Sequence, residues 1–181
     1  LTVRAPEGDD TVYRLARLTD ALDLVTRLNH QSGRSVGVVP ELKQPAWHRA
    51  DGVDLAEAVQ ELLASWSARN TGAAVVVQCF ERDALRGIAG SSGRPARRVW
   101  NLSGSLPSPE DLEERTVGLA GIGLSRGTFE GPDAPGPALL QRAHELGLEV
   151  FVWTFRGDEA ALTAFLRRFP ADAVFVDDPD V

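Results

Sequence analysis

The stretch Ala73–Phe80, AAVVVQCF, is a nearly continuous apolar run that carries Gln78 close to its carboxyl end. A strand that is buried on both faces shows this pattern, whereas a half-buried strand alternates apolar and polar residues. The run VFV within the segment 171–179 has the same character. Both runs are typical of a parallel sheet that is covered by helices.

Helical patterns alternate with such strands along most of the chain. The helix predicted over 19–29 has Thr19 as its expected N-cap, and the last predicted helix has Asp158. Strands are predicted at 35–42, 73–80, 96–102, 117–125, 148–155 and 171–179, and helices or helical turns at 19–29, 54–66, 81–90, 108–115, 137–147 and 158–169. This order predicts an α/β fold with about six strand–helix units.

Polar residues stand near the carboxyl end of almost every predicted strand, and they distinguish between two α/β architectures. In a closed barrel these ends form one ring that carries the active site, whereas in an open sheet only the ends beside a switch point meet. The spread favours a (β/α)8 TIM-barrel type of fold, truncated to about six units, as a single domain over residues 1–181. The polar residues are Glu41, Lys43, Gln78, Asn101, Ser125, Trp153, Thr154 and Asp177.

The composition excludes several classes of protein. A net charge of −7 and a pI near 5.0 argue against a general nucleic-acid binder and a polybasic membrane-surface protein. The single cysteine, Cys79, permits no disulfide within the chain and no cysteine zinc cluster. No apolar run approaches the roughly 18 residues that a membrane span needs. The chain opens at Leu1 and contains no methionine, so its location stays open. The sequence does not give the oligomeric state either.

Glu41 and Lys43 place a carboxylate and an ammonium at the end of a predicted strand, in the stretch Gly37–His48, GVVPELKQPAWH. Because the two residues are two positions apart, their side chains point the same way in a strand. They can simply form an ion pair. They can also recruit a hard cation and meet a phosphate oxygen, which are the two tasks that phosphodiester cleavage requires.

Four segments together resemble the glycerophosphodiester phosphodiesterases, most closely the periplasmic bacterial type. The most specific segment is LTDALDLVTRLNHQSGRSVGVVPELKQPAWHRADGVDLAEAV, because its PELKQPAWH run is similar to a motif of that family. The segments VVVQCFERDALRGI, GLEVFVWTFR and ADAVFVDDPD follow in the family's order. The resemblance covers most of the chain from about Thr19 onward.

This resemblance implies a (β/α)8 barrel that hydrolyses glycerophosphodiesters to glycerol 3-phosphate and an alcohol with a divalent metal, Ca2+ or Mg2+. It implies that Glu41 is a metal ligand and that Lys43 is a catalytic residue beside the substrate phosphate. Gln78, Phe80 and Trp153 would line the pocket. The resemblance also suggests a secreted or periplasmic location, although a cytoplasmic one is compatible with the sequence.

The sequence lacks the His-Arg-Gly, Glu-x-Asp and His-Asp motifs that supply the acid, the base and further metal ligands in this family. His30, His48 and His144 match no catalytic position, and His48 is expected in a loop. We therefore expect an incomplete site without measurable turnover. The alternative is a non-catalytic barrel-like domain that binds a phosphorylated or polyol ligand or a protein partner. An aldolase-like role of Lys43 is disfavoured because Glu41 would keep the amine protonated.

Overall fold

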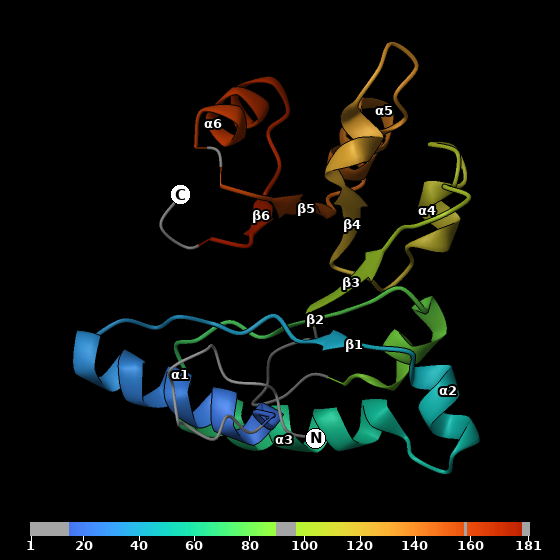
Figure 1. Cartoon of the computed structure of the whole chain (residues 1–181). Helices are drawn as coiled ribbons and strands as arrows, with labels where there is room; N and C mark the ends of the chain where they lie inside the picture. The colour runs from blue at the N-terminus through green and yellow to red at the C-terminus, as the bar shows by residue number, and fades with distance from the viewer. Residues whose placement is uncertain (1–14, 90–96, 158, 179–181) are drawn as a thin grey trace, which may run out of the picture.

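The computed structural model describes residues 15–89, 97–157 and 159–178, and in these ranges the chain forms one six-stranded sheet (Figure 1). Its strands follow chain order, and every neighbouring pair is parallel. All six strands fall inside their predicted ranges. They are β1 (Glu41–Leu42), β2 (Val76–Cys79), β3 (Arg97–Asn101), β4 (Gly121–Ser125), β5 (Glu149–Phe155) and β6 (Ala173–Val176).

The first strand is much shorter than its predicted range of 35–42. Before β1, one isolated bridge joins Val38 to Val75 on the chain that leads into β2. Pro40 then interrupts the ladder, because proline has no N–H to donate, although its carbonyl still accepts from the backbone of Gln78 at 3.0 Å. The predicted strand is therefore extended chain that ends in a two-residue strand.

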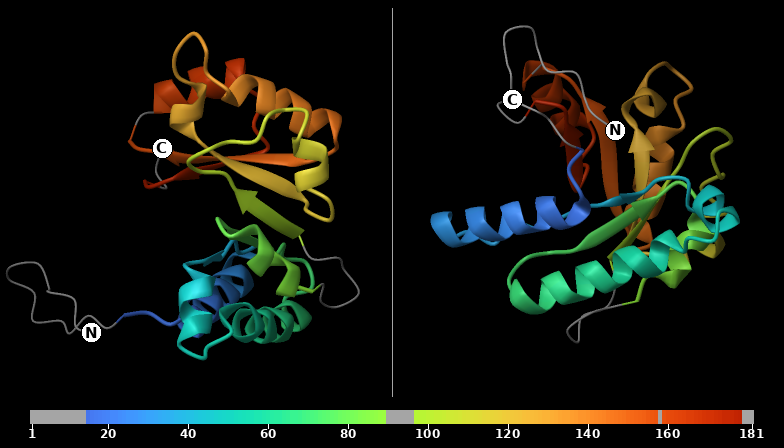
Figure 2. Two further views of the ribbon diagram at one scale, coloured as in Figure 1. Left: turned by 90° about the vertical axis from the view of Figure 1, so that its right-hand side faces the viewer. Right: turned by 60° about the horizontal axis from the view of Figure 1, so that its bottom comes forward.

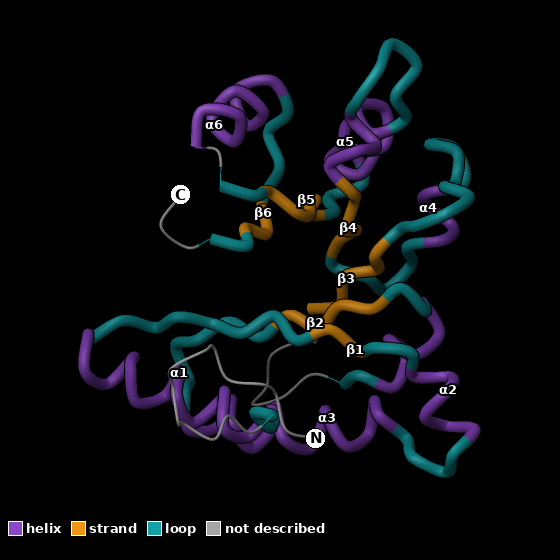
Figure 3. Tube along the Cα trace, viewed as in Figure 1, coloured by secondary structure: helices purple, strands orange, loops and turns teal. Residues whose placement is uncertain are grey.

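The sheet is strongly curled, as two further views show (Figure 2). Two strands separate β2 from β5, and in a flat sheet this spacing would place them about 14 Å apart. The ring of Phe80, just after β2, nevertheless lies 5.6 Å from the ring of Trp153 on β5. The strands thus form a half-barrel with helices between them (Figure 3), which confirms the truncated barrel fold that the sequence predicts.

The described ranges contain six α-helices and two 3-10 helices, and all of them except α1 connect strands. In α3, the backbone N–H groups of Ala56 and Glu57 donate to the carboxylate of the N-cap Asp54 at 3.0 and 3.1 Å. The helices are α1 (Leu18–Ser32), α2 (Pro45–Ala50), α3 (Leu55–Arg69), α4 (Leu112–Arg115), α5 (Gly136–Glu145) and α6 (Glu159–Arg168), with η1 (Arg82–Gly87) and η2 (Arg126–Phe129).

Two helix predictions are wrong in detail. Thr19 is not an N-cap, because α1 begins one residue earlier and the N-cap is Arg17, whose N–H donates to Asp20 at 2.9 Å. The loop expected around His48 is the helix α2. Its Pro45 lies in the first turn, where a missing N–H costs no helical hydrogen bond. The predicted cap Asp158 lies outside the described residues.

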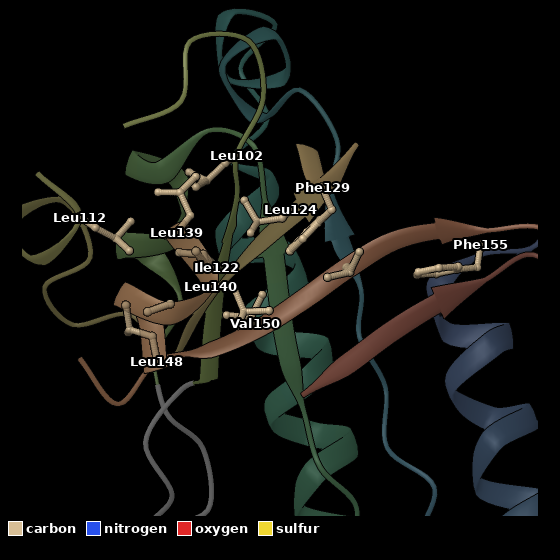
Figure 4. Packing of buried hydrophobic residues seen from close by; sticks show 12 residues of the cluster. Leu102, Leu112, Ile122, Leu124, Phe129, Leu139, Leu140, Leu148, Val150 and Phe155 are labelled. Atoms are coloured by element: carbon tan, nitrogen blue, oxygen red, sulfur yellow. The ribbon is translucent and has the colours of Figure 1, made fainter. Parts of the chain in front are cut away.

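Two hydrophobic clusters join the sheet to the helices. One links β4 and β5 to α5 and includes Ile122, Leu124 and Val150 (Figure 4). The other surrounds the fully buried Trp66 of α3, whose indole Nε1 donates to the carbonyl of Leu22 in α1 at 3.0 Å. These clusters cover the convex side of the half-barrel. No helix in the described ranges is long and apolar enough to cross a membrane.

The concave side is filled in layers by the alternate residues of each strand. At the amino ends, Arg97 of β3 reaches across β4 to Glu149 of β5, with Nη2 2.5 Å from Oε2. Gly121 of β4 lies close to the backbone of β5, since a Cβ there would lie 2.4 Å from the carbonyl oxygen of Glu149. Above this ion pair, Val99 and Phe151 belong to a small buried apolar cluster. This apolar layer separates the ion pair from the polar side chains at the carboxyl ends of the strands.

Candidate active site

Glu41 and Lys43 stand at the carboxyl end of β1, as the sequence predicts. Lys43 Nζ lies 2.8 Å from Glu41 Oε1. Glu41 is only 19% exposed in its side chain, whereas Lys43 is 75% exposed. The ammonium of Lys43 is close enough to the Glu41 carboxylate for an ion pair. Its direction, however, does not give the buried Oε1 a well-formed hydrogen bond, and no other described residue donates one. The carboxylate is therefore mostly buried, while the ammonium beside it is open to solvent.

A buried amide pair lies beside Glu41 on the concave face. Gln78 pairs with Glu41 in the β1–β2 register. The Nδ2 of Asn101 on β3 donates to Gln78 Oε1 at 3.0 Å, and both side chains are almost fully buried. Asn101 is a polar strand-end residue in the sequence, but the sequence alone does not connect it with Gln78. Its contact with Gln78 depends on the register of β2 and β3.

Gly123 of β4 makes the position of Asn101 possible. The two residues are register partners, and a Cβ on Gly123 would lie 2.1 Å from Asn101 Oδ1. The side chain of Asn101 thus occupies the space that any larger residue of β4 would fill. Sequence reasoning had a signal for this in the spaced glycines of GIGLS, because glycine inside a strand often marks a close approach.

Phe80 and Trp153 form an aromatic wall at the same end of the sheet. Their rings meet edge to face at an interplanar angle of 75°. A cavity of about 410 Å³ adjoins Trp153 and is lined by Ser125, Arg126 and Arg156 among others. Arg156 is paired with Asp177 at 2.9 Å, so Asp177 ties the segments after β5 and β6 together, as its position in the sequence suggests.

Three buried polar atoms on this face have no hydrogen-bond partner among the described residues. They are Oε1 of Glu41, Oδ1 of Asn101 and Nε1 of Trp153. Buried polar groups in folded proteins are almost always paired with protein, water or a ligand. These atoms lie on β1, β3 and β5, so unsatisfied polar groups are spread along the concave face of the sheet.

Cys79 does not belong to this site. Its side chain alternates with Gln78 and lies in the hydrophobic cluster on the convex side, where it is fully buried. Burial raises the pKa of the Cys79 thiol, so the group stays neutral near pH 7. This agrees with the prediction that Cys79 is a core residue.

The described residues do not by themselves form a divalent metal site. No cluster of three or more histidine, cysteine, aspartate or glutamate side chains occurs in these ranges. Glu41 offers one carboxylate and Asn101 one amide oxygen, whereas Ca2+ and Mg2+ take about six or more oxygen ligands. His48 on α2 packs edge-on against Trp47 at 4.9 Å, and His144 lies 2.9 Å from Asp172 near the amino end of β5.

Comparison with known proteins assigns the lineage. The crystal structure of a protein from Silicibacter pomeroyi DSS-3, assigned as a glycerophosphoryl diester phosphodiesterase, is similar in fold, with a TM-score of 0.61 and 20% sequence identity. The likeness covers 90% of this chain but only 53% of that chain. A sequence model of the glycerophosphoryl diester phosphodiesterase family matches residues 4–181. Because this match extends over nearly the whole sequence, the chain belongs to the glycerophosphoryl diester phosphodiesterase family.

Proposed function

We propose that this chain takes part in the hydrolysis of a glycerophosphodiester to glycerol 3-phosphate and an alcohol, with help from a divalent cation. The observation that carries the proposal is the half-buried Glu41 with an exposed, reorientable ammonium on Lys43, beside the buried Gln78–Asn101 pair. Family membership supplies the phosphodiester chemistry. The chain spans about half of the similar structure, so the activity is proposed for the full-length protein.

Lys43 is the residue that meets the substrate phosphate in this proposal. Attack on phosphorus builds negative charge on the non-bridging oxygens, and a positioned ammonium stabilises that charge. Lys43 is the only lysine in the sequence, and its exposed side chain can exchange Glu41 for a phosphate oxygen. Phe80 and Trp153 would form the wall against which the glycerol carbons pack.

Glu41 is the residue that contacts the cation. A bound Ca2+ or Mg2+ would supply electrostatic stabilisation of the phosphoryl oxygens. Since no cluster of three or more potential ligand side chains occurs in the described ranges, we expect further ligands to come from outside them. We therefore expect residues 1–181 alone to show no measurable turnover.

The test is glycerol 3-phosphate release by the full-length protein, coupled to glycerol 3-phosphate dehydrogenase. Lys43→Ala should reduce kcat by about 10²-fold, the usual cost of losing one stabilising donor. Lys43→Arg should retain part of the rate, because it keeps the charge. Glu41→Gln should abolish metal dependence and most of the rate, whereas the matched change Glu61→Gln on α3 should have no effect.

A full-length protein that is silent on every glycerophosphodiester, or a Glu41→Gln variant that runs at the parental rate, would refute the enzyme proposal. The absence of a three-ligand cluster from the described residues favours the second candidate in that case, a non-catalytic domain that binds a phosphorylated or polyol ligand. Calorimetry with glycerol 3-phosphate would then detect binding that Lys43→Ala weakens.

A further inference from the structure

A second cavity lies on the helix-facing side of the sheet, and arginine dominates its lining. It has a volume of about 660 Å³ and is lined by Arg82 and Arg86 of η1, Arg98 of β3 and Arg115 of α4, among others. Arg98 precedes Val99, whose side chain lies in the concave cluster. Because successive strand residues point to opposite faces, Arg98 points away from the candidate active site. The two sites are therefore separate.

The guanidinium groups here are held by groups that do not cancel their charge. Arg98 Nη2 donates to the carbonyl of Gly118 at 2.7 Å, and Arg82 Nη1 donates to the carbonyl of Arg115 at 3.0 Å. Arg82 also lies over the ring of Trp100, 5.8 Å from its centroid. Within the described part of the chain, Arg82, Arg98 and Arg115 form no ion pair.

Carboxylates only partly balance this charge. Arg86 is paired with Asp83 at 3.5 Å, and Asp111 and Glu114 also line the cavity. Arg98 Nε, however, is buried and has no hydrogen-bond partner among the described residues. An unpaired donor on a cation is costly, so the positive charge that remains around the cavity favours a bound anion.

The cavity also has an apolar wall. Val117 is 82% exposed and lines it together with Leu119. The volume is in the range of sites for organic molecules rather than for an inorganic ion alone. A ligand that fits both walls has an anionic head and an organic body.

We propose that this cavity binds a phosphate monoester, with the phosphate among the guanidinium groups of Arg82, Arg98 and Arg115. The planar fork of arginine donates two parallel hydrogen bonds to phosphate oxygens, and a doubly charged head matches several arginines better than one carboxylate does. The organic group packs on Val117 and Leu119. The site does not depend on the proposed catalytic function.

Calorimetric titration of the full-length protein with phenyl phosphate tests this inference, with inorganic phosphate and benzoate as comparison ligands. We expect one saturable site at which phenyl phosphate binds more tightly than inorganic phosphate and much more tightly than benzoate. Arg82→Gln and Arg115→Gln should each weaken binding by about tenfold, the effect of one lost charge-assisted hydrogen bond. Arg27→Gln, an equal change of charge on exposed α1, should leave it unchanged.

Lys43→Ala separates this cavity from the candidate active site. It should leave phenyl phosphate binding unchanged. If Lys43→Ala abolishes binding while both arginine variants retain it, the ligand occupies the active site and the proposal is overturned. Absence of saturable binding, or equal affinity for benzoate, overturns it as well. Arg115→Gln guards against misfolding as the cause of a loss, because the side chain of Arg115 makes no hydrogen bond or ion pair among the described residues, and a thermal unfolding curve checks each variant.

Discussion

At the residue scale, one glycine on β4 makes room for the polar pair of the candidate site. Gly123 is the register partner of Asn101, and the space beside its Cα is occupied by Asn101 Oδ1. This lets Asn101 turn inward and donate to Gln78. The Gln78–Asn101 pair beside Glu41 thus depends on the absence of a Cβ at Gly123 on β4.

Gly123→Ala should destabilise the protein by about 1–3 kcal/mol, the usual cost of overpacking a buried position. The new methyl group would have to displace the buried Asn101 and break its bond to Gln78. Urea unfolding monitored by tryptophan fluorescence measures the effect. Gly127→Ala is the matched control, because a Cβ there would have no neighbour closer than 3.6 Å.

A double variant makes this prediction specific. In an Asn101→Ala background, the clash disappears, so Gly123→Ala should cost clearly less than in the parent. Equal costs in both backgrounds would show that Asn101 is not the group that excludes a side chain at position 123.

At the scale of elements, α3 shows how one capping residue defines where a helix begins. The Asp54 carboxylate accepts from the N–H groups of Ala56 and Glu57, which would otherwise lack a partner in the first turn. The hydrogen bond from Glu57 is the main cause that lowers the pKa of Asp54, and the nearby Arg49 adds to it. The charged form of Asp54 is therefore favoured in the folded state.

This lowered pKa predicts how the cap depends on pH. Its stabilisation is fully present above the unfolded-state pKa of about 3.9 and is lost as the pH falls through the lower folded-state value. Asp54→Ala should therefore lower the Tm at pH 7, and the difference from the parent should shrink below about pH 4. Asp51→Ala, which removes a charge outside the cap, is the control. A difference in Tm that is independent of pH would contradict this account.

At the scale of the whole molecule, the two sides of the half-barrel are joined through its concave face. The ion pair between Arg97 and Glu149 links β3 to β5 across β4, at the end of the sheet opposite the candidate site. Both side chains are about 40% exposed or slightly less, so solvent screens part of their attraction. Arg97 and Glu149 are nevertheless fixed by strands that pair with the same neighbour.

A double-mutant cycle with Arg97→Gln and Glu149→Gln should therefore give a coupling energy of about 0.5–1 kcal/mol that decreases at high salt. The exposed pair Arg86–Asp83 on η1 serves as the comparison, with a coupling close to zero. A coupling energy that does not change with salt, or one no larger than that of Arg86–Asp83, would show that the ion pair across β4 does not stabilise the protein electrostatically.

Binding of a divalent cation is also a property of the whole molecule, because it depends on how many ligands the fold brings together. Since the described ranges hold no cluster of three or more potential ligands, we expect residues 1–181 to bind Ca2+ or Mg2+ only weakly, with Kd of about 10⁻³ M or larger. Calorimetric titration measures this, and Glu41→Gln should abolish the residual heat. Submicromolar binding would reveal further ligands, and Glu81 and Asp177 would be the first to replace.

Much of the architecture follows from local pattern in the sequence. All six strands occur within their predicted ranges. Of the two apolar runs predicted to be buried on both faces, the one in 73–80 forms the fully buried β2, whereas the one in 171–179 forms β6, which is only partly buried because it lies at the edge of the sheet. Because successive side chains of a strand point to opposite faces, the sequence also predicts that Gln78 and Cys79 point in opposite directions. Local rules failed where two of them competed, as at Pro45, which looks like a helix breaker but is also favourable in a first helical turn.

Only the tertiary structure decides which of these residues meet. The contact between Phe80 and Trp153 joins positions 73 residues apart and depends on the curl of the sheet, which no local pattern encodes. The bond between Asn101 and Gln78 depends on strand register and on the empty position at Gly123. The arginine cavity needs η1, β3 and α4 to pack side by side. The sequence determined which residues stand at the strand ends, because side-chain alternation is local, and the packing of the half-barrel determined which of them share a site.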